Sequence, residues 1–391
     1  MKSAVRHLVR VLRRGSQRFG NWVNNYEPVG TGTMPSSLRI CTADVCHSCG
    51  KSPGVTRANR IIYLLPYGNS PTGGNKVSYR EIEIISDSGT PCFAFHPEKP
   101  GFSYGWFSHR VQTLPTGHFD PRTDFLVFSE MWAALATRFC VPARLRYAIF
   151  VQNGYLAHNS AGFGFEVLRE AYRGADLILS ISTDTTQVIK LLYPFVPDSK
   201  ILRMFYSLPA VFAPGVKEKV ITYMPRKLRA HSERLRLYLG NVLPEGWRIR
   251  AIDNMEERDV AELMSRSAIF LSFSDLEGYA IPPLEAAISG NIVVGYTGEG
   301  TKEYFFGPIF REVPNGNLLR FIAEVQVAIQ DVDTNIASDR QFQEQLRSLA
   351  DTHSVRNEVD HVMRFVNRVR EIMSARRVTV AITPDGCSTS P

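Results

Sequence analysis

Two carboxylates stand close together in the stretch SDLEGYAIPPLEAAISG, residues 274–290. Glu277 and Glu285 have seven residues between them, and a Pro-Pro pair lies in that gap. Two carboxylates can act as an acid and a base on one bond, as in glycoside hydrolysis. When both are ionised, they can instead accept hydrogen bonds from the hydroxyl groups of a single ligand.

The elements that must position these acids favour the second chemistry. The apolar run AIFLSFS predicts a buried strand, so Glu277 is expected on the loop at its carboxyl end, where open α/β sheets bind ligands. The Pro-Pro pair suits the first turn of a helix over 283–289, and Gly290 suits its left-handed cap. We therefore expect Glu285 in the first helical turn, where the helix dipole keeps a carboxylate ionised and able to bind a vicinal diol such as ribose. Taken singly, each acid would also fit a solvated position.

Short apolar runs and amphipathic stretches alternate along the chain in two consecutive blocks. In the first block, the strand candidates are RIIYLLPYG and residues 91–95, 124–129, 146–152, 176–182 and 200–206. In the second block, they are VITYM, WRIRAI, AIFLSFS and NIVVGY. Strands that are apolar on both faces and alternate with helices indicate parallel sheets covered on both sides. We therefore predict an α/β chain of two facing Rossmann-like domains with a cleft between them.

Segments rich in proline and glycine mark the expected boundaries. LPAVFAPGVKEK, residues 208–219, separates the two blocks, and VRNEVDHVMRFVNRVREIM predicts an amphipathic helix that packs back across the domains. The expected parts are a basic leader and linker over 1–59, an N-terminal domain over 60–212, a C-terminal domain over 213–353, a crossing helix over 354–375 and a tail over 376–391.

The composition is that of a soluble globular protein with a basic leader. The 391 residues suffice for two cores, and no apolar run approaches the ~18–20 residues that cross a bilayer. The formal charge is +7, and no acid precedes Glu27. Within residues 1–26, MKSAVRHLVRVLRR predicts a short basic amphipathic helix suited to an anionic membrane surface or an acidic partner. A solvated leader and a transit peptide are the alternatives. No secretory signal and no nucleic-acid recognition motif is found, so no nucleic-acid partner is expected.

The six cysteines are too sparse for a disulfide framework and suit a reducing compartment. Cys41, Cys46 and Cys49, together with His47, could form a small metal or redox site. No second CxxC motif follows them, so unpaired surface thiols are the favoured interpretation.

The stretch SDLEGYAIPPLEAAISGNIVVGYTGEGTKEY resembles the donor-sugar region of the retaining, family 4 type glycosyltransferases, also called glycosyl transferases group 1, which have the GT-B fold. In that family a strand leads into S-x-x-E-G-(aromatic)-x-x-P-x-x-E-A and then a glycine stop. DLILSISTDTTQVIKLLYP, KILRMFYSLPAVFAP and VITYMPRKL fit the family's order, so the resemblance covers roughly residues 60–310. It implies transfer of a sugar from a nucleotide-sugar donor to an acceptor hydroxyl.

The resemblance also implies roles for the residues of the motif. Glu285 would hold the ribose hydroxyls of the donor, and Glu277 would hold the hydroxyls of the donor sugar. Gly278 and Tyr279 would shape the floor beneath the sugar and the diphosphate.

The diphosphate would need positive charge, which follows the expected strand VITYM. The family commonly places an arginine at this strand end and a lysine about five residues later. This chain has Arg226 and Lys227 side by side, followed by Arg229 and His231, and we assign the pair Arg226 and Lys227 to the diphosphate. A generic basic patch is the alternative.

Two glycine loops and one polar segment complete the expected site. Gly73 and Gly74, before the first helix, would let backbone N–H groups approach a phosphate or the acceptor. Gly298 and Gly300 would do the same on the donor side.

Many family members have a histidine near the sugar after the fourth strand of the first domain. This chain has Gln152 and Asn153 there, with His158 further on. We expect Gln152 or Asn153 to contact the sugar. A His158 side chain that reaches back to it is one alternative, and a surface or packing role is the other.

The resemblance implies a retaining, metal-independent hexosyl- or deoxyhexosyltransferase with no cofactor, since the nucleotide-sugar is a substrate. Its acceptor would be a glycan or a lipid-linked sugar in the synthesis of a surface polysaccharide or glycolipid. The expected location is cytoplasmic, at the inner face of the membrane. The alternatives are another GT-B enzyme, such as a nucleotide-sugar epimerase, and a non-catalytic scaffold with a degenerate transferase fold.

Overall fold

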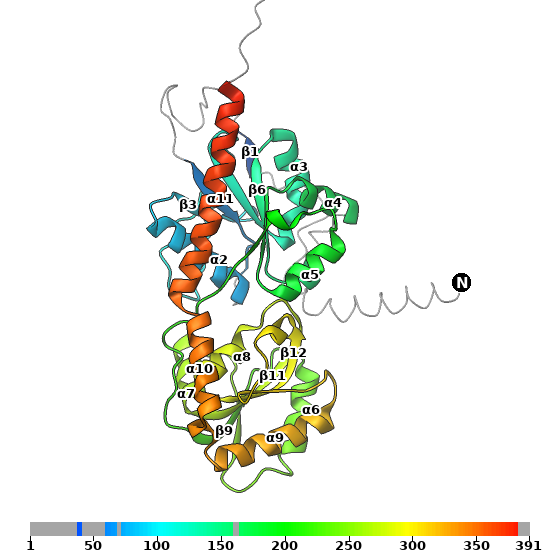
Figure 1. Cartoon of the computed structure of the whole chain (residues 1–391), viewed down its shortest axis with the longest axis vertical. Coiled ribbons are helices and arrows are strands. Elements are labelled where there is room, and N and C mark those ends of the chain that lie inside the picture. Colours follow the sequence, from blue (N-terminus) through cyan, green and yellow to red (C-terminus); the bar gives the residue numbers. More distant parts are fainter. Residues whose placement is uncertain (1–36, 41–58, 69–71, 159–163, 382–391) are drawn as a thin grey trace, which may run out of the picture. The chain divides into compact units, whose positions relative to one another are not determined.

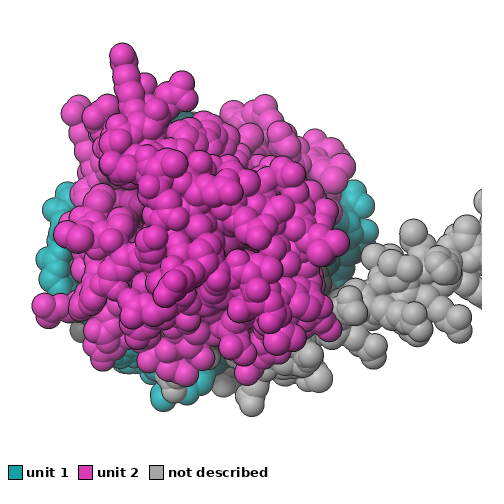
Figure 2. Space-filling view, turned by 90° about the horizontal axis from the view of Figure 1, so that it is seen from below, with its two compact units in different colours: residues 1–150, 156–178, 368–391 teal, residues 151–155, 179–367 magenta. Residues whose placement is uncertain are grey.

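The computed structural model describes residues 37–40, 59–68, 72–158 and 164–381 (Figure 1). Unit 1, the first of two compact units, comprises residues 1–150, 156–178 and 368–391, and unit 2 comprises residues 151–155 and 179–367 (Figure 2). The leader helix expected within 1–26 and the group Cys41, Cys46, His47 and Cys49 lie outside the described residues. The domain boundary expected between 212 and 213 stays a prediction.

The first sheet has six strands in the order β3-β2-β5-β6-β7-β8. The strands are β2 (Arg60–Leu64), β3 (Cys92–Phe95), β5 (Asp124–Ser129), β6 (Arg146–Val151), β7 (Leu177–Ser180) and β8 (Ile201–Arg203). β2 pairs in parallel with β3 and β5, and β5 pairs in parallel with β6. Every residue of β2 and of β5 is buried, as expected of strands covered on both faces.

The helices of this part of the chain are α2 (Gly73–Asp87), α3 (Ala133–Ala143), α4 (Phe165–Gly174) and α5 (Thr183–Leu192). The sequence pattern predicts helices over 130–139, 164–173 and 183–193. α4 and α5 match the last two segments to within one residue, and α3 begins three residues later than predicted, after a short 3₁₀ turn. A small second sheet pairs β1 (Leu38–Ile40) with β4 (Gly117–Phe119) in parallel.

The third sheet lies in unit 2 and has five parallel strands in the order β10-β9-β11-β12-β13. They are β9 (Glu218–Tyr223), β10 (Arg248–Ala251), β11 (Ser267–Glu277), β12 (Ile292–Glu299) and β13 (Phe310–Glu312). The helices that follow them along the chain are α6 (Arg229–Leu239), α7 (Glu257–Arg266), α8 (Ile281–Ile288), α9 (Leu318–Asp333) and α10 (Arg340–Thr352). The core packs β9, β11 and β12 against α6, α8 and α9 around Leu235, Phe273 and Phe321. The predicted α/β class with parallel sheets is confirmed.

The long C-terminal helix, α11 (Val355–Ala381), extends six residues beyond the predicted range of 354–375. Its buried positions Val362, Phe365, Val366, Val369 and Met373 follow helical spacing, as the sequence pattern indicated. Within the part of the chain that the structure describes, no helix has the length and hydropathy to cross a membrane.

Candidate active site

The five-stranded sheet changes direction at β9, because the chain passes from β9 to β10 on one side and then returns to β11 on the other. Open α/β sheets bind ligands at such a switch point, outside the carboxyl ends of the strands. Lys227, in the turn between β9 and α6, and Glu277 come together there. Glu277 is the last residue of β11 and not part of the predicted loop after it, because the strand continues past AIFLSFS and pairs Glu277 with Glu299. Their side chains form an ion pair and are 21% and 14% exposed. The structure thus joins two predicted site residues that are 50 positions apart.

Arg226 lies in the same turn and is exposed. Its guanidinium makes no hydrogen bond or ion pair with any described residue. The neighbouring side chains of Lys227 and Arg229, in contrast, form ion pairs with glutamates. Arg229 Nε donates to Glu233 Oε1 at 2.7 Å, and His231 Nδ1 lies 3.3 Å from the hydroxyl of Tyr296. Arg226 is therefore open to an anionic ligand.

Three non-glycine residues at the carboxyl ends of β9, β11 and β12 have a positive φ. The angles are 45° at Leu228, 44° at Leu276 and 72° at Glu299. Such conformations cost roughly 1–3 kcal/mol each and persist where the surrounding structure fixes them, often at functional sites. At Leu276 the cause is a shift in the β11–β12 register between Ser274 and Glu277, which re-aims the last residue of β11.

The predicted glycines of the donor side allow close backbone approach within unit 2. A Cβ on Gly278 would lie 2.2 Å from the carbonyl oxygen of Gln152, and a Cβ on Gly300 would lie 2.0 Å from the carbonyl oxygen of Gly278. A Cβ on Gly298 would lie 3.1 Å from Cβ of Glu277. The loop 298–300 therefore packs directly beneath Glu277, and packing alone requires these glycines.

The prediction that Glu285 lies in the first turn of its helix is wrong. α8 begins at Ile281, two residues before the predicted start, so Glu285 is its fifth residue and the first turn holds no acid. The reason is that the first N–H groups of a helix have no intrahelical partner, so the Pro-Pro pair is tolerated after Ile281. The dipole argument for an ionised Glu285 therefore fails, and only 9% of the residue is exposed. A ribose contact from Glu285 stays a prediction.

The predicted end of the same helix is confirmed. Gly290 has φ +82°, and its N–H donates to the carbonyl of Ala287 at 2.8 Å. The N–H of Asn291 donates to the carbonyl of Ala286 at 3.0 Å, which completes a Schellman cap.

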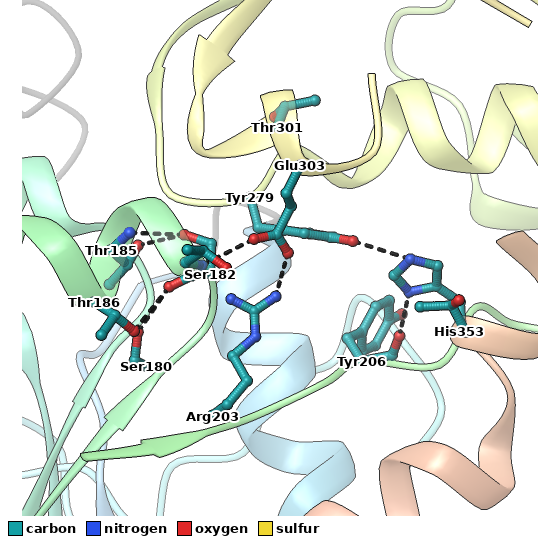
Figure 3. Close-up of polar contacts among 12 residues, drawn as sticks. Ser180, Ser182, Thr185, Thr186, Arg203, Tyr206, Tyr279, Thr301, Glu303 and His353 are labelled. Atoms are coloured by element: carbon teal, nitrogen blue, oxygen red, sulfur yellow. Dashed lines mark hydrogen bonds and ion pairs between the residues drawn. The ribbon is translucent and has the colours of Figure 1, made fainter. Parts of the chain in front are cut away.

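The side chain of Tyr279 is turned into the protein (Figure 3). Its hydroxyl lies 2.9 Å from Nε2 of His353, and Nδ1 of His353 lies 3.1 Å from the carbonyl oxygen of Tyr206. Because a carbonyl only accepts, Nδ1 carries the proton and Nε2 accepts from Tyr279. Burial lowers the pKa of His353 and raises the pKa of Tyr279, so both stay neutral. The role of Tyr279 in the floor beneath the donor stays a prediction. Because the side chain is engaged by His353, only the backbone of Tyr279 could serve in it.

Asn153 holds the strained end of β11. Its Nδ2 donates to the carbonyl of Leu276 at 2.9 Å, and its Oδ1 accepts from the N–H of Tyr155 at 3.0 Å. Gln152 lies beneath Gly278 through its carbonyl oxygen. Sugar contacts from Gln152 or Asn153 stay predictions.

Gly73 and Gly74 are the first two residues of α2. The N-cap residue, Thr72, makes no side-chain capping bond, and the first turn contains no acid. Residues 69–71, which precede it, are not among those described. A phosphate or acceptor contact at this helix start stays a prediction.

We compared the sequence of the chain with those of known proteins. No protein-family model matches the chain. Over 118 residues it is 26% identical to an alpha-1,6-glucosyltransferase of Actinobacillus pleuropneumoniae serotype 7, covering 29% of this chain and 32% of that protein. The match thus spans about a third of that relative's length.

Solved structures match most of the chain. HepE of Anabaena in complex with UDP superposes with a TM-score of 0.60 at 11% identity, over 81% of this chain and 100% of that one. The lipopolysaccharide outer core galactosyltransferase WaaB gives 0.55 at 13% identity, over 80% and 99% of the two chains. Sucrose-phosphate synthase of Thermosynechococcus elongatus gives 0.54 at 12% identity, over 81% and 100%. The fold is that of the GT-B glycosyltransferases.

In this GT-B chain a cavity of about 310 Å³ lies at the carboxyl ends of β11, β12 and β13. Its lining includes Gly298, three acids and one cation, namely Asp275, Glu299, Glu312 and Lys302. No group of three or more His, Cys, Asp or Glu suited to a metal ion occurs among the residues that the structure describes.

Sequence reasoning missed the polar contacts of Glu303, Arg203 and Thr301, which lie beside this site (Figure 3). GEGTKEY drew attention for its glycines, and the acid that follows them carries no recognisable spacing to residues 183 or 203. Only the fold brings these positions together.

Proposed function

We propose that the chain is a glycosyltransferase that moves a hexosyl or deoxyhexosyl group from a nucleotide-sugar to a hydroxyl of a glycan or lipid-linked acceptor. The observation that carries the proposal is the Lys227–Glu277 pair at the switch point between β9 and β11, with Arg226 open beside it. The GT-B fold, the glucosyltransferase relative and the UDP bound by HepE support it. One of these neighbours, WaaB, is a lipopolysaccharide outer core galactosyltransferase, which supports a role in surface polysaccharide or glycolipid synthesis.

Each residue has a part in the proposed complex. Arg226 and Lys227 bind the diphosphate, since guanidinium and ammonium groups form charge-assisted hydrogen bonds with phosphate oxygens. Glu277 accepts hydrogen bonds from the donor sugar, and Glu285 accepts them from the ribose. The backbone of Gly278, with that of Tyr279, forms the floor.

Lys227 changes partner in this scheme. In the structure its ammonium is paired with Glu277, and when the donor binds, the diphosphate replaces that carboxylate. Glu277 is then released to the sugar hydroxyls. A pair that is only partly buried can exchange in this way, because water already reaches both groups.

We propose retention of configuration and chemistry without a metal, in line with the resemblance to the family 4 type. The bond from the anomeric carbon to the β-phosphate oxygen breaks, and the acceptor oxygen bonds to the same face of that carbon. The acceptor proton passes to the departing phosphate oxygen. Two cations at the end of β9 balance the charge that develops there, which is the part a metal would otherwise play.

The direct test is a hydrolysis and transfer screen across nucleotide-sugars, followed by calorimetry with UDP. We expect turnover with one donor class and UDP binding that weakens at least tenfold in Arg226→Ala and in Glu285→Ala. Arg234→Ala is the matched control, because Arg234 is an exposed arginine of α6 whose guanidinium, among the described residues, donates only to the carbonyl of Ala230. UDP binding unchanged in both site variants would contradict the assignment. UDP binding without turnover of any donor would favour a scaffold.

We further propose that the protein acts at the cytoplasmic face of an anionic membrane through residues 1–26. Sedimentation with vesicles of anionic and of neutral lipid tests this for the whole chain and for residues 27–391. Equal partitioning of the two proteins onto anionic vesicles would remove the proposal.

A further inference from the structure

The carboxylate of Glu303 joins three segments that are far apart in the sequence (Figure 3). Glu303 is the last residue of the short 3₁₀ helix η5 (Gly300–Glu303), which follows the loop 298–300. Its Oε2 accepts a hydrogen bond of 2.8 Å from the N–H of Thr183, and its Oε1 forms an ion pair with Arg203. Both oxygens are therefore used, each by a donor more than 90 positions away.

The two donors suit an ionised carboxylate. Thr183 is the first residue of α5, whose free N–H groups and dipole favour a negative charge. Arg203 ends β8, and its guanidinium is a donor that forms strong charge-assisted hydrogen bonds with a carboxylate. An amide at position 303 would turn its NH₂ group toward a donor at one of these two contacts.

Arg203 is itself held by aromatic rings. Its guanidinium carbon lies 4.8 Å from the ring centre of Phe205 and 5.9 Å from that of Tyr279. Rings at such distances attract the cation through their quadrupoles. Arg203 thus contacts both Glu303 and the tyrosine that follows Gly278, and His353 holds the far end of that tyrosine.

The helix η5 in turn holds the backbone beyond Glu277. Oγ1 of Thr301 accepts from the N–H of Ala280 at 3.0 Å, and the hydroxyl of Tyr304 donates to the carbonyl of Ala280. Gly300 packs on the carbonyl of Gly278. A displacement of η5 must therefore move residues 277–280, which carry the proposed sugar contact.

We propose that Glu303 and Arg203 are positioning residues of the transferase reaction, holding η5 so that the loop 298–300 supports the Glu277 carboxylate. The inference rests on the proposed function. Neither residue touches the reacting atoms in it. They act through the backbone of residues 277–280, where a displacement of about 1 Å can cost up to about 100-fold in rate.

Glu303→Gln, Arg203→Ala and Arg203→Lys test the inference, with Lys190→Ala as the matched control. Lys190 lies near the C-terminal end of α5, seven residues after Thr183, and forms an exposed ion pair with Asp198 at 2.8 Å in the same unit. We expect kcat for donor hydrolysis to fall about 10- to 100-fold in Glu303→Gln and Arg203→Ala, with KM and UDP binding within about threefold of wild type. Arg203→Lys, which keeps the charge, should recover most of the lost rate, and Lys190→Ala should match wild type.

Hydrogen exchange supplies a readout that needs no substrate. Amides of residues 277–280 and 298–304 should exchange at least tenfold faster in Glu303→Gln and in Arg203→Ala, and at wild-type rates in Lys190→Ala. Unchanged exchange in those two segments overturns the inference even if the wild-type protein proves to have no transferase activity. An active wild type whose Glu303→Gln and Arg203→Ala variants keep full kcat also overturns it and leaves the proposed function intact.

Discussion

Among the ion pairs of the described residues, two at strand ends differ in their surroundings: Arg60–Asp124 at the amino ends of β2 and β5, and Lys227–Glu277 beyond the carboxyl ends of β9 and β11. In the first, Arg60 Nε and Nη2 donate to Asp124 at 2.6 Å and 2.5 Å, and the two side chains are 10% and 0% exposed. Asp124 also accepts from the N–H of Asp120 and from the hydroxyl of Thr123. In the second, Lys227 meets only one oxygen of Glu277, and both side chains reach water.

The two pairs differ in how many of the carboxylate's hydrogen-bond acceptor sites are occupied by donors of the protein. Every oxygen of Asp124 is satisfied by donors of the protein, so the Arg60–Asp124 pair fixes strand register and offers nothing to a ligand. The Lys227–Glu277 pair is single, partly hydrated and bordered by the positive-φ residues Leu228 and Leu276. An ion pair therefore stabilises the fold at the amino ends of the six-stranded sheet, whereas another is available for ligand binding at the carboxyl ends of the five-stranded sheet.

The largest expected effect comes from opening the saturated pair. Asp124→Ala leaves the buried Arg60 charge without its carboxylate, with a hydrogen bond to the carbonyl of His118 still in place, and we expect the free energy of unfolding to fall by about 3–5 kcal/mol. Urea unfolding followed by circular dichroism measures this. Glu344→Ala, which breaks an exposed pair with Arg340, should cost less than about 0.5 kcal/mol. A loss below about 1 kcal/mol in Asp124→Ala would show that the two ion pairs do not differ as described.

Glu277→Gln should reduce activity strongly while changing stability little, which is the reverse of the emphasis expected for Asp124→Ala. The side chain keeps its shape but loses its charge, so we expect kcat/KM for the donor to fall about 100- to 1,000-fold, as when one preorganised contact to a transition state is removed. The free energy of unfolding should stay within about 1 kcal/mol of wild type, since a partly exposed pair contributes little. Steady-state kinetics and urea unfolding of the same preparation decide it. A variant that is destabilised and fully active would place the pair among the structural ones.

The pH dependence of stability tests a second buried and fully hydrogen-bonded polar group, His96, which follows β3. His96 is fully buried between the hydroxyl of Tyr79 and the carbonyl of Pro66, and burial lowers its pKa to about 4. Below the unfolded value near 6.5 the unfolded chain binds a proton that the folded protein does not, so stability falls as the pH drops from 6.5 to 4. We expect His96 to contribute a loss of about 2 kcal/mol between pH 7 and pH 5.

The measurement is urea unfolding at both pH values for wild type and for His96→Gln, in which this part of the loss should disappear. An equal pH dependence of the two proteins would mean that His96 is protonated in the folded state.

The smallest expected effect tests the strain at the open end. Glu299 has φ +72° and is exposed, with an ion pair to Lys302 as its charged contact. In Glu299→Gly the strain is relieved at the cost of a weak surface pair, and we expect a net gain of about 1 kcal/mol in stability. Thermal unfolding measures it. A loss of stability would mean that the loop 298–300 is not strained.

The sequence predicted the buried strands and the helix cap better than the partly exposed residues of the candidate site. β2 and β5 are buried throughout, and β11 and β12 are buried except at their carboxyl ends, so their apolar patterns located them to within a few residues. Glu277, Lys227 and Gly290 followed from strand ends and cap chemistry, which are local properties. The start of α8 was misplaced because a Pro-Pro pair fits several positions of a first turn.

What the sequence did not predict depends on tertiary contact. The choice of Lys227 rather than Arg226 as the partner of Glu277 depends on the left-handed turn at Leu228 and the register shift before Glu277. The contacts of Glu303 with Thr183 and Arg203 join segments more than 90 residues apart, and no local periodicity encodes such a meeting.

The central claim is that Lys227 exchanges Glu277 for the diphosphate while Glu277 turns to the sugar. Calorimetry of UDP and of UDP-glucose with wild type and Glu277→Gln tests it most directly. The exchange predicts that Glu277→Gln binds UDP as tightly as wild type or more tightly, because Lys227 is already free, and binds UDP-glucose at least tenfold more weakly. Equal weakening of both ligands, or no change in either, would contradict it.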